Sequence, residues 1–276
     1  KVTGRARYAA DINLPGQLIG KVLRSPHAHA LIRAIDTSKA EALPGVFAVI
    51  TGADFPDPGE HMTQAGEGGA QSIINKSADI MARGKAHYAG HPIAAVAARD
   101  LPTAEAALAL IEVDYEVLPP VMTAAAAMAE GAPIIMADLR TDEGGTELDG
   151  ETNVSEHSVA EEGDLDAGFA AADFVIETEY FTSPVHQGYI EPMNGTAWWR
   201  DDGTLDIWGS SQGHFGIRGE VSELLLIPVS RIRVVPMEIG GGFGGKTTSY
   251  LEPLAAVLSR KSGRPVKMTM TREEVL

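Results

Sequence analysis

A run of glycines at residues 240–245 restricts the possible folds of this chain more than any other feature. Five of these six residues are glycine, and Phe243 is the exception. The run lies between a β-rich stretch, Arg231–Ile239, and a helical pattern, Ser249–Lys261. Glycine adopts φ > 0 and lets the backbone approach a ligand closely, and consecutive N–H groups near a helix start attract anions. The pattern predicts a ligand-binding loop between a strand and a helix.

The same segment satisfies the P-loop pattern G-x-x-x-x-G-K-T from Gly240 to Thr247, with Lys246 in the place of the phosphate-binding lysine. Three features oppose nucleotide binding. Phe243 is bulky for a loop that wraps phosphates, Pro253 interrupts the start of the next helix, and residues 248–276 contain no Walker B strand. A P-loop NTPase is an alternative that the sequence leaves open.

A second motif, Gly209-Ser210-Ser211-Gln212-Gly213, satisfies the G-x-S-x-G pattern of a nucleophile elbow. In hydrolases of that type the histidine of the triad follows the serine, whereas the last histidine here is His214, directly beside the motif. A serine hydrolase is therefore not predicted. Gln212 instead offers a neutral amide, both donor and acceptor, at a turn whose small neighbours leave room for a ligand.

A polar cluster at His186–Pro192 places Glu191 directly before a proline. A glutamate near a histidine is one arrangement for general acid–base catalysis. A Glu-Pro turn held by hydrogen bonds to the backbone is the commoner outcome. We therefore predict a structural role for Glu191.

Composition excludes several classes of protein. The chain has no cysteine, which excludes disulfides, cysteine-ligated zinc and iron–sulfur clusters held by this chain. The formal charge of −16 argues against nucleic acid as a partner. The longest apolar runs, such as Ala124–Ala129, are too short to insert into a membrane, and no signal segment is recognisable. The expected location is the cytoplasm, or the periplasm by means of a partner's signal.

Hydrophobic patterns indicate an α+β chain with two globular units, 1–137 and 153–276, joined by an acidic linker at 138–152. The stretch Asp57–Gly90 is predicted to be irregular. Strands are predicted at Leu18–Leu23, Leu31–Ile35, Val46–Ile50, Pro92–Ala98, Glu112–Val117, Val154–Ala160, Phe174–Phe181, Thr196–Arg200, Thr204–Trp208 and Val266–Thr271. Further helices are predicted at Thr103–Ile111, Ala124–Ala129 and Gly213–Leu226, and after an N-cap at Asp164.

Taken together, the motifs resemble the large subunit of the molybdenum hydroxylase family, which includes xanthine dehydrogenase and aldehyde oxidase. In the first unit the matching motifs are Thr3–Tyr8, Arg24–Ala30, Gly90–Val96 and Val113–Pro119. In the second unit they are His186–Pro192, Ser211-Gln212, Gly240–Lys246 and Thr271–Glu274. The resemblance covers nearly the whole chain. It implies an N-terminal α/β hammerhead domain followed by a partial, mixed α/β molybdopterin-binding domain.

The resemblance also implies roles for single residues. Gln212 matches the glutamine that hydrogen-bonds an oxo ligand of molybdenum. Phe243, together with Gly241, Gly242 and Gly244, matches the loop whose backbone lies against the metal and its dithiolene. The expected contacts on the metal side are therefore Gln212 and Phe243.

Thr247 stands where purine-oxidising members carry a substrate-binding glutamate, which argues against xanthine as the substrate. The catalytic glutamate of the family belongs to a later segment that is absent from this sequence. No catalytic base is therefore assigned, and the chain by itself is expected to be inactive.

The implied activity is the oxidation of an aldehyde or an N-heteroaromatic small molecule with water as the oxygen source. The implied cofactor is molybdenum-molybdopterin, as the cytosine dinucleotide in a bacterial member. Electrons would pass to 2Fe-2S clusters and FAD on partner subunits or regions, and the remaining molybdopterin-binding region or subunit would be a further partner. A third hypothesis is an inactive scaffold without cofactor.

Overall fold

The computed structural model describes residues 1–59, 61–65 and 69–276. The chain forms two compact units. The larger unit consists of Lys1–Leu118 together with Gln187–Leu276, and the smaller unit consists of Pro119–His186. These units are defined by contacts in space. The domain limits proposed from composition along the sequence are different, and they remain a proposal: 1–137, 138–152 and 153–276. Both ends of the chain thus build the larger unit.

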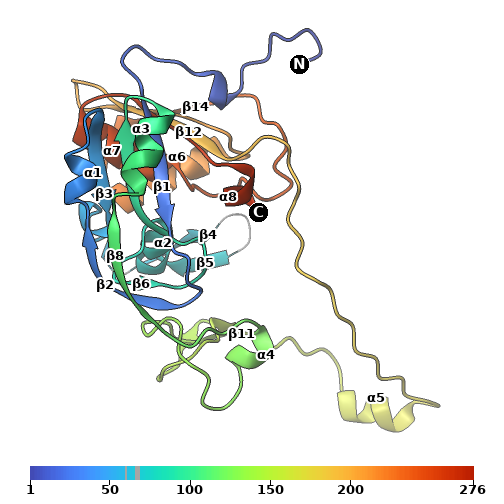
Figure 1. Ribbon diagram of the computed structural model, residues 1–276. Coiled ribbons are helices and arrows are strands. Elements are labelled where there is room, and N and C mark those ends of the chain that lie inside the picture. Colours follow the sequence, from blue (N-terminus) through green and yellow to red (C-terminus); the bar gives the residue numbers. More distant parts are fainter. Residues whose placement is uncertain (60, 66–68) are drawn as a thin grey trace. The chain divides into compact units, whose positions relative to one another are not determined.

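A seven-stranded mixed sheet forms the centre of the larger unit (Figure 1). Its strand order is β14 (Ile232–Val235), β13 (Leu205–Gly209), β12 (Asn194–Trp199), β15 (Val266–Thr269), β1 (Leu18–Arg24), β7 (Pro92–Ala98) and β3 (Val46–Thr51). The two halves of the chain meet where β15 pairs in parallel with β1, with Leu18 opposite Val266. The predicted strands Thr196–Arg200 and Thr204–Trp208 are confirmed, and they pair as the antiparallel hairpin of β12 and β13, with Ala197 opposite Ile207.

Helices cover both faces of this sheet. Strand β7 is buried on both sides, as its continuous apolar run predicts. Ala95 and Ala97 share a cluster with Leu258 of α7 (Glu252–Ser262). The alternate residue Val96 shares a second cluster with Ala104 of α3 (Leu101–Leu108). In the described part of the chain, no helix has the length and apolar character needed to cross a lipid bilayer.

The larger unit contains further elements outside the seven-stranded sheet. They are α6 (His214–Leu225), the strands β2 (Ala30–Asp36), β6 (Lys85–Ala86) and β8 (Glu112–Val117), the hairpin β4 (Met62–Ala65) and β5 (Gly69–Ser72), the helices α1 (Ser38–Glu41), α2 (Ile73–Ile80) and α8 (Arg272–Val275), and the 3-10 turns η1 (Ala9–Asp11), η2 (Gly52–Asp54) and η3 (Val229–Arg231).

The prediction that Asp57–Gly90 is irregular is wrong for much of the stretch, because β4, β5, α2 and β6 lie within it. Residues 60 and 66–68 of this stretch are outside the described residues. Helix α2 buries Ile73, Lys76, Ser77 and Ile80, which recur at helical spacing. A buried lysine and a buried serine on that face concealed the hydrophobic period in the sequence.

The smaller unit has little regular structure. Its elements are α4 (Ala124–Ala127), β9 (Asp142–Glu143), β10 (Thr146–Glu147), β11 (Glu156–His157) and α5 (Leu165–Ala171). The side chain of Asp164 caps α5, as the sequence predicts, and that of Thr123 caps α4. The predicted strand Val154–Ala160 is reduced to β11, and Phe174–Phe181 forms no strand.

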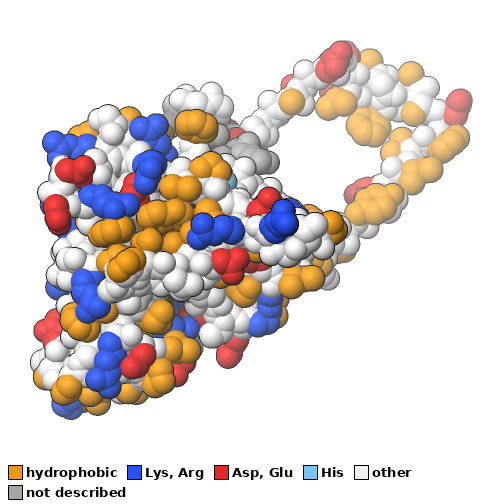
Figure 2. All heavy atoms as spheres, turned by 90° about the horizontal axis from the view of Figure 1, so that it is seen from above, with side chains coloured by type: hydrophobic (Ala, Val, Ile, Leu, Met, Phe, Trp, Pro, Cys, Tyr) orange, Lys and Arg blue, Asp and Glu red, His pale blue; other side chains and the backbone are white. Residues whose placement is uncertain are grey.

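Exposure explains why Phe174–Phe181 differs from the prediction. Its large apolar side chains are exposed, Phe174 by 78% and Tyr180 by 86%, and apolar side chains are visible along this extended segment in Figure 2. The alternation of apolar and polar residues in the sequence indicates which side chains of a strand would be buried, but it does not indicate whether the backbone has a partner. A strand also needs a neighbouring strand to satisfy its backbone N–H and C=O groups, and no described residue of the smaller unit supplies one.

Candidate functional site

The ends of three strands bring the predicted site residues to one edge of the sheet. Strands β13 and β14 are adjacent and parallel, so the loops that follow them lie side by side. Gln212 follows β13, and the glycine-rich loop, Gly240–Thr247, follows β14. Strand β12 is antiparallel to β13, so Glu191, which precedes β12, lies at the same edge. This topology unites motifs that are about fifty residues apart in sequence.

The glycine-rich loop holds the side chain of Gln212. Its Oε1 atom accepts hydrogen bonds from the backbone N–H groups of Gly244, at 3.0 Å, and Lys246, at 3.1 Å. The backbone N–H of Gln212 donates to the Lys246 carbonyl at 2.8 Å. Its Nε2 atom donates to no described residue. The amide is therefore fixed through its oxygen while its N–H donors can bind a ligand.

The backbone of the loop forms a cradle around this amide. Gly241 and Phe243 adopt φ of +96° and +50°, and the side chain of Phe243 is 73% exposed. A non-glycine residue at positive φ costs about 1–3 kcal/mol and is concentrated at functional sites. A Cβ atom on Gly242 would lie 2.5 Å from Gln212 Oε1, so a side chain at this position would have to displace the amide. The N–H groups of Gly242 and Phe243 donate to no described residue.

Lys246 is fully buried beneath the loop. Its Nζ atom donates to Glu191 Oε2 and to the Glu191 carbonyl, each at 2.9 Å, and lies 4.8 Å from the ring centroid of Tyr189. Glu191 Oε2 also accepts from Gly240 N–H at 2.8 Å. The predicted structural role of Glu191 is confirmed. The ion pair itself and the contact with Tyr189 were not predicted, since only the opposite charges of Glu191 and Lys246 hint at them in the sequence.

This geometry argues against the P-loop alternative. A phosphate-binding lysine must face the ligand, whereas Lys246 faces the interior and is neutralised by Glu191. The Thr247 hydroxyl donates to the Gly244 carbonyl at 3.1 Å. Helix α7 begins only at Glu252, so no helix N-terminus lies at the end of the loop.

The structure also opposes the serine hydrolase interpretation. Ser211 is buried, and its hydroxyl donates to the Lys246 carbonyl at 3.4 Å. The same hydroxyl accepts from Gly213 N–H at 3.0 Å. Ser211 therefore shapes the turn that presents Gln212 and does not face a substrate.

A buried carboxyl group, Glu252, lies behind the strand ends. It is 5% exposed, and its Oε2 atom accepts from Tyr250 N–H at 3.0 Å. A Cβ atom on Gly209, at the end of β13, would lie 2.6 Å from Glu252 Oε1. Burial raises the pKa of Glu252 to about 7, against hydrogen bonds that lower it. No motif or local pattern in the sequence predicts this group.

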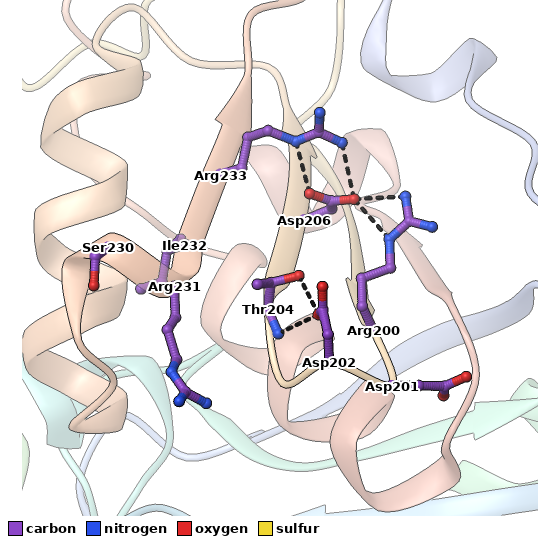
Figure 3. A pocket seen from close by; sticks show the side chains of 9 residues that line it. All are labelled: Arg200, Asp201, Asp202, Thr204, Asp206, Ser230, Arg231, Ile232 and Arg233. Atoms are coloured by element: carbon purple, nitrogen blue, oxygen red, sulfur yellow. Dashed lines mark hydrogen bonds and ion pairs between the residues drawn. The ribbon is translucent and has the colours of Figure 1, made fainter.

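Of the pockets that open near these strands, two lie at the ends of β13. One, of about 540 Å³, is lined by Gln212 and Thr247 and extends along α6, so the structure brings the predicted substrate-side residue Thr247 beside Gln212. The other, of about 560 Å³, lies at the opposite end of β13. Figure 3 shows Asp206 in that second pocket between the guanidinium groups of Arg200 and Arg233.

The second pocket has a structural explanation. Asp206 is buried, which opposes its ionisation, but the hydrogen bonds from Arg233 and Arg200 prevail and lower its pKa. Arg200 also stacks on Trp198, with 3.6 Å between its guanidinium carbon and the ring centroid. The carboxylate therefore satisfies both cations and fixes the β12–β13 hairpin to β14.

Comparison with known proteins agrees with the geometry of the loop. A family model of the molybdopterin cofactor-binding domain matches residues 148–276, and one of the aldehyde oxidase and xanthine dehydrogenase a/b hammerhead domain matches residues 3–119. The xanthine dehydrogenase molybdenum-binding subunit of Escherichia coli O157:H7 is 35% identical over 99% of this chain and 35% of its own length. The nicotinate dehydrogenase large molybdopterin subunit of Eubacterium barkeri is 34% identical over 99% of this chain and 59% of its own length.

Solved structures give the same result. Quinoline 2-oxidoreductase from Pseudomonas putida 86 matches with a TM-score of 0.82 and 32% identity, over 99% of this chain and 33% of that one. Reconstituted CO dehydrogenase from Oligotropha carboxidovorans matches with a TM-score of 0.82 and 36% identity, over 99% of this chain and 34% of that one. The chain spans between a third and three fifths of the length of these relatives. It belongs to the xanthine dehydrogenase and aldehyde oxidase family of molybdenum hydroxylases.

Proposed function

We propose that this chain holds one side of a molybdopterin cofactor in a molybdenum-dependent hydroxylase. The hydroxylase would oxidise an aldehyde or an N-heteroaromatic molecule with water as the oxygen source. The observation that carries the proposal is the Gln212 amide, which is anchored by two loop N–H groups through its oxygen and keeps its own N–H donors available. When bound, the cofactor supplies a two-electron acceptor for the substrate carbon.

The residues of the loop fit such a group. At Gly242 the loop backbone lies directly against the Gln212 amide, where a Cβ atom would clash, and the N–H groups of Gly242 and Phe243 are available to an electronegative ligand. We assign Gln212 and Phe243 to the metal side, Gly241, Gly242 and Gly244 to the cofactor, and Thr247 to the substrate. Gln212, Phe243 and the three glycines position the ligand and transfer no proton.

The proposal includes partners and a location. The remaining molybdopterin-binding region or subunit would supply the catalytic base, and 2Fe-2S clusters and FAD would lie on partner subunits or regions. For a bacterial protein the cofactor would be the cytosine dinucleotide form. We propose the cytoplasm as the location.

Metal analysis by mass spectrometry tests the proposal directly. The chain is purified alone and after co-expression with the partners encoded beside it. We expect equimolar molybdenum only in the assembled sample. Molybdenum in neither sample, together with tight ATP binding that depends on Lys246, would instead support the P-loop NTPase.

Two variants connect the metal content with the loop. Gln212→Ala removes the anchored amide and is expected to lower the molybdenum content of the assembled protein. Gln17→Ala removes a glutamine at the opposite edge of the sheet, where its side chain accepts a hydrogen bond from Leu14 N–H and from no other described residue, and should retain the metal. Equal molybdenum content in both variants would show that Gln212 does not help to hold the cofactor.

A further inference from the structure

The pocket beside Gln212 continues along one face of helix α6. Its lining residues on the helix recur every three or four positions, as Gly216, Glu220 and Glu223 show. Thr63, from strand β4, forms part of the facing wall. A molecule that reaches Gln212 through this pocket therefore passes two carboxyl groups.

The first carboxyl group, Glu220, is neutralised by its neighbours. It forms an ion pair with Lys76 at 2.8 Å, and both side chains are buried. It also accepts from the Thr248 hydroxyl, at 3.0 Å, and from Ser249 N–H, at 2.7 Å. Glu220 thus fixes α2 and the segment after the glycine-rich loop to α6, and it presents no unbalanced charge to the pocket.

The second carboxyl group, Glu223, has no cationic neighbour of the kind that Lys76 provides for Glu220. Its side chain is exposed, and it accepts a hydrogen bond from the Thr63 hydroxyl. Within the described residues it forms no ion pair. The field of this charge in a partly enclosed pocket is stronger than on an open surface, because the protein walls displace water.

The hydroxyl groups of the pocket also present acceptors. Thr63 donates its proton to Glu223, and Thr247 donates its proton to the Gly244 carbonyl. Each hydroxyl oxygen can therefore only accept a further hydrogen bond. Gln212 Nε2 is the donor at the inner end. A molecule with N–H donors or a positive charge suits these walls, and a carboxylate would face acceptors of its own sign.

We propose that this pocket admits the substrate and selects nitrogen heteroaromatics that carry a cationic amine or N–H donors over those that carry a carboxylate. The proposal rests on the proposed function, since it assigns the pocket to the substrate of that site. Glu223 is the residue that determines the selection by charge, and Thr63 and Thr247 add acceptors.

The test compares two ligands of nearly equal shape, 3-(aminomethyl)pyridine and pyridine-3-carboxylate. Their dissociation constants for the assembled, molybdenum-loaded protein are measured by ligand-observed NMR, which needs no turnover. We expect the amine to bind about ten-fold more tightly, a difference that one carboxylate near the ligand in a partly enclosed site provides. Equal affinity, tighter binding of the carboxylate, or no binding of either ligand would overturn the proposal.

Variants separate Glu223 from the net charge of the protein. Glu223→Gln should reduce the preference for the amine to about two-fold or less, and Glu223→Lys should reverse it. Glu105→Gln removes an exposed carboxylate on α3 and should leave the preference unchanged. An unchanged preference in Glu223→Gln would also overturn the proposal. Failure to load molybdenum would contradict the proposed function, whereas a loaded protein with the wrong preference would contradict only this inference.

Discussion

At the scale of single residues, the ammonium group of Lys246 connects the glycine-rich loop to the start of β12. Its side chain is fully buried and that of Glu191 is 10% exposed. Replacing one partner of a buried ion pair leaves the other charge without compensation and costs about 3–5 kcal/mol. We therefore expect Lys246→Met to lower the free energy of unfolding by about that amount, measured by urea denaturation.

The control for this variant is an ion pair at the surface. Lys39 pairs with Glu112, and both side chains are largely exposed, so Lys39→Met should cost less than about 1 kcal/mol. The double variant Lys246→Met with Glu191→Gln removes both buried charges and should recover part of the lost stability. If Lys246→Met unfolds at the same urea concentration as the unmodified protein, the ion pair does not stabilise the loop.

Glu252 makes a contribution to stability that depends on pH. Its pKa is about 7 in the folded protein and 4.5 in a free side chain. The folded state therefore binds the proton more tightly than the unfolded state. Tighter proton binding by Glu252 therefore adds its full contribution to the free energy of unfolding below a pH of about 4.5. As the pH rises to about 7 this contribution is lost, which lowers the free energy of unfolding by about 3 kcal/mol.

The variant Glu252→Gln isolates this contribution. Its neutral amide keeps an acceptor for Tyr250 N–H and has no carboxyl proton to lose. We expect thermal unfolding of the variant to match the unmodified protein at about pH 4.5 and to occur at higher temperature above about pH 7. A variant that is equally destabilised at both pH values would show that the shape of the side chain matters and its titration does not.

At the scale of elements, the glycine-rich loop and the turn of Gln212 act as one structure. A Cβ atom on Gly242 would lie 2.5 Å from Gln212 Oε1 and 2.7 Å from its Cδ atom, so Gly242→Ala must displace the amide. We expect this variant to break the two hydrogen bonds of Gln212 Oε1, to lose about 1–3 kcal/mol of stability, and to contain less molybdenum when assembled. Metal analysis and urea denaturation measure the two effects.

A glycine in open space provides the matched control. Gly168 lies in α5, and no atom stands within 4 Å of the Cβ that Gly168→Ala would add. Alanine is the better helix former by about 1 kcal/mol, so this variant should be no less stable than the unmodified protein. Normal molybdenum content in Gly242→Ala would show that the loop can accommodate a side chain at that position.

Elements whose signal is local could be predicted from the sequence. The apolar run of β7, the hairpin turn between β12 and β13, and the helical spacing of α6 and α7 each depend on residues that are neighbours in the chain. Gln212 and the glycine-rich loop come together because they follow β13 and β14, which are adjacent and parallel. Three features depend on contacts between distant residues, which hydrophobic periodicity does not report. They are the pairing of Lys246 with Glu191, the burial of Glu252 and the missing strand at Phe174–Phe181.

At the scale of the whole molecule, the negative charge is unevenly distributed along the chain. The smaller unit, Pro119–His186, contains 15 of the 38 Asp and Glu residues and only Arg140 of the 22 Lys and Arg residues. The larger unit is therefore nearly balanced in charge. The overall acidity that argued against nucleic acid as a partner is a property of the smaller unit, and the Gln212 site lies in the larger one.

The larger unit is built from two distant parts of the chain, and this predicts the outcome of limited proteolysis. Strand β1, from the N-terminal part, is hydrogen-bonded between β15 and β7. Chymotrypsin should cut first at the exposed Phe174, Tyr180 or Phe181, and should spare Tyr189, which is 4% exposed. Because β1 and β15 share a sheet, the two pieces should elute together in size-exclusion chromatography and separate only in denaturant. Pieces that separate in native buffer would contradict this pairing.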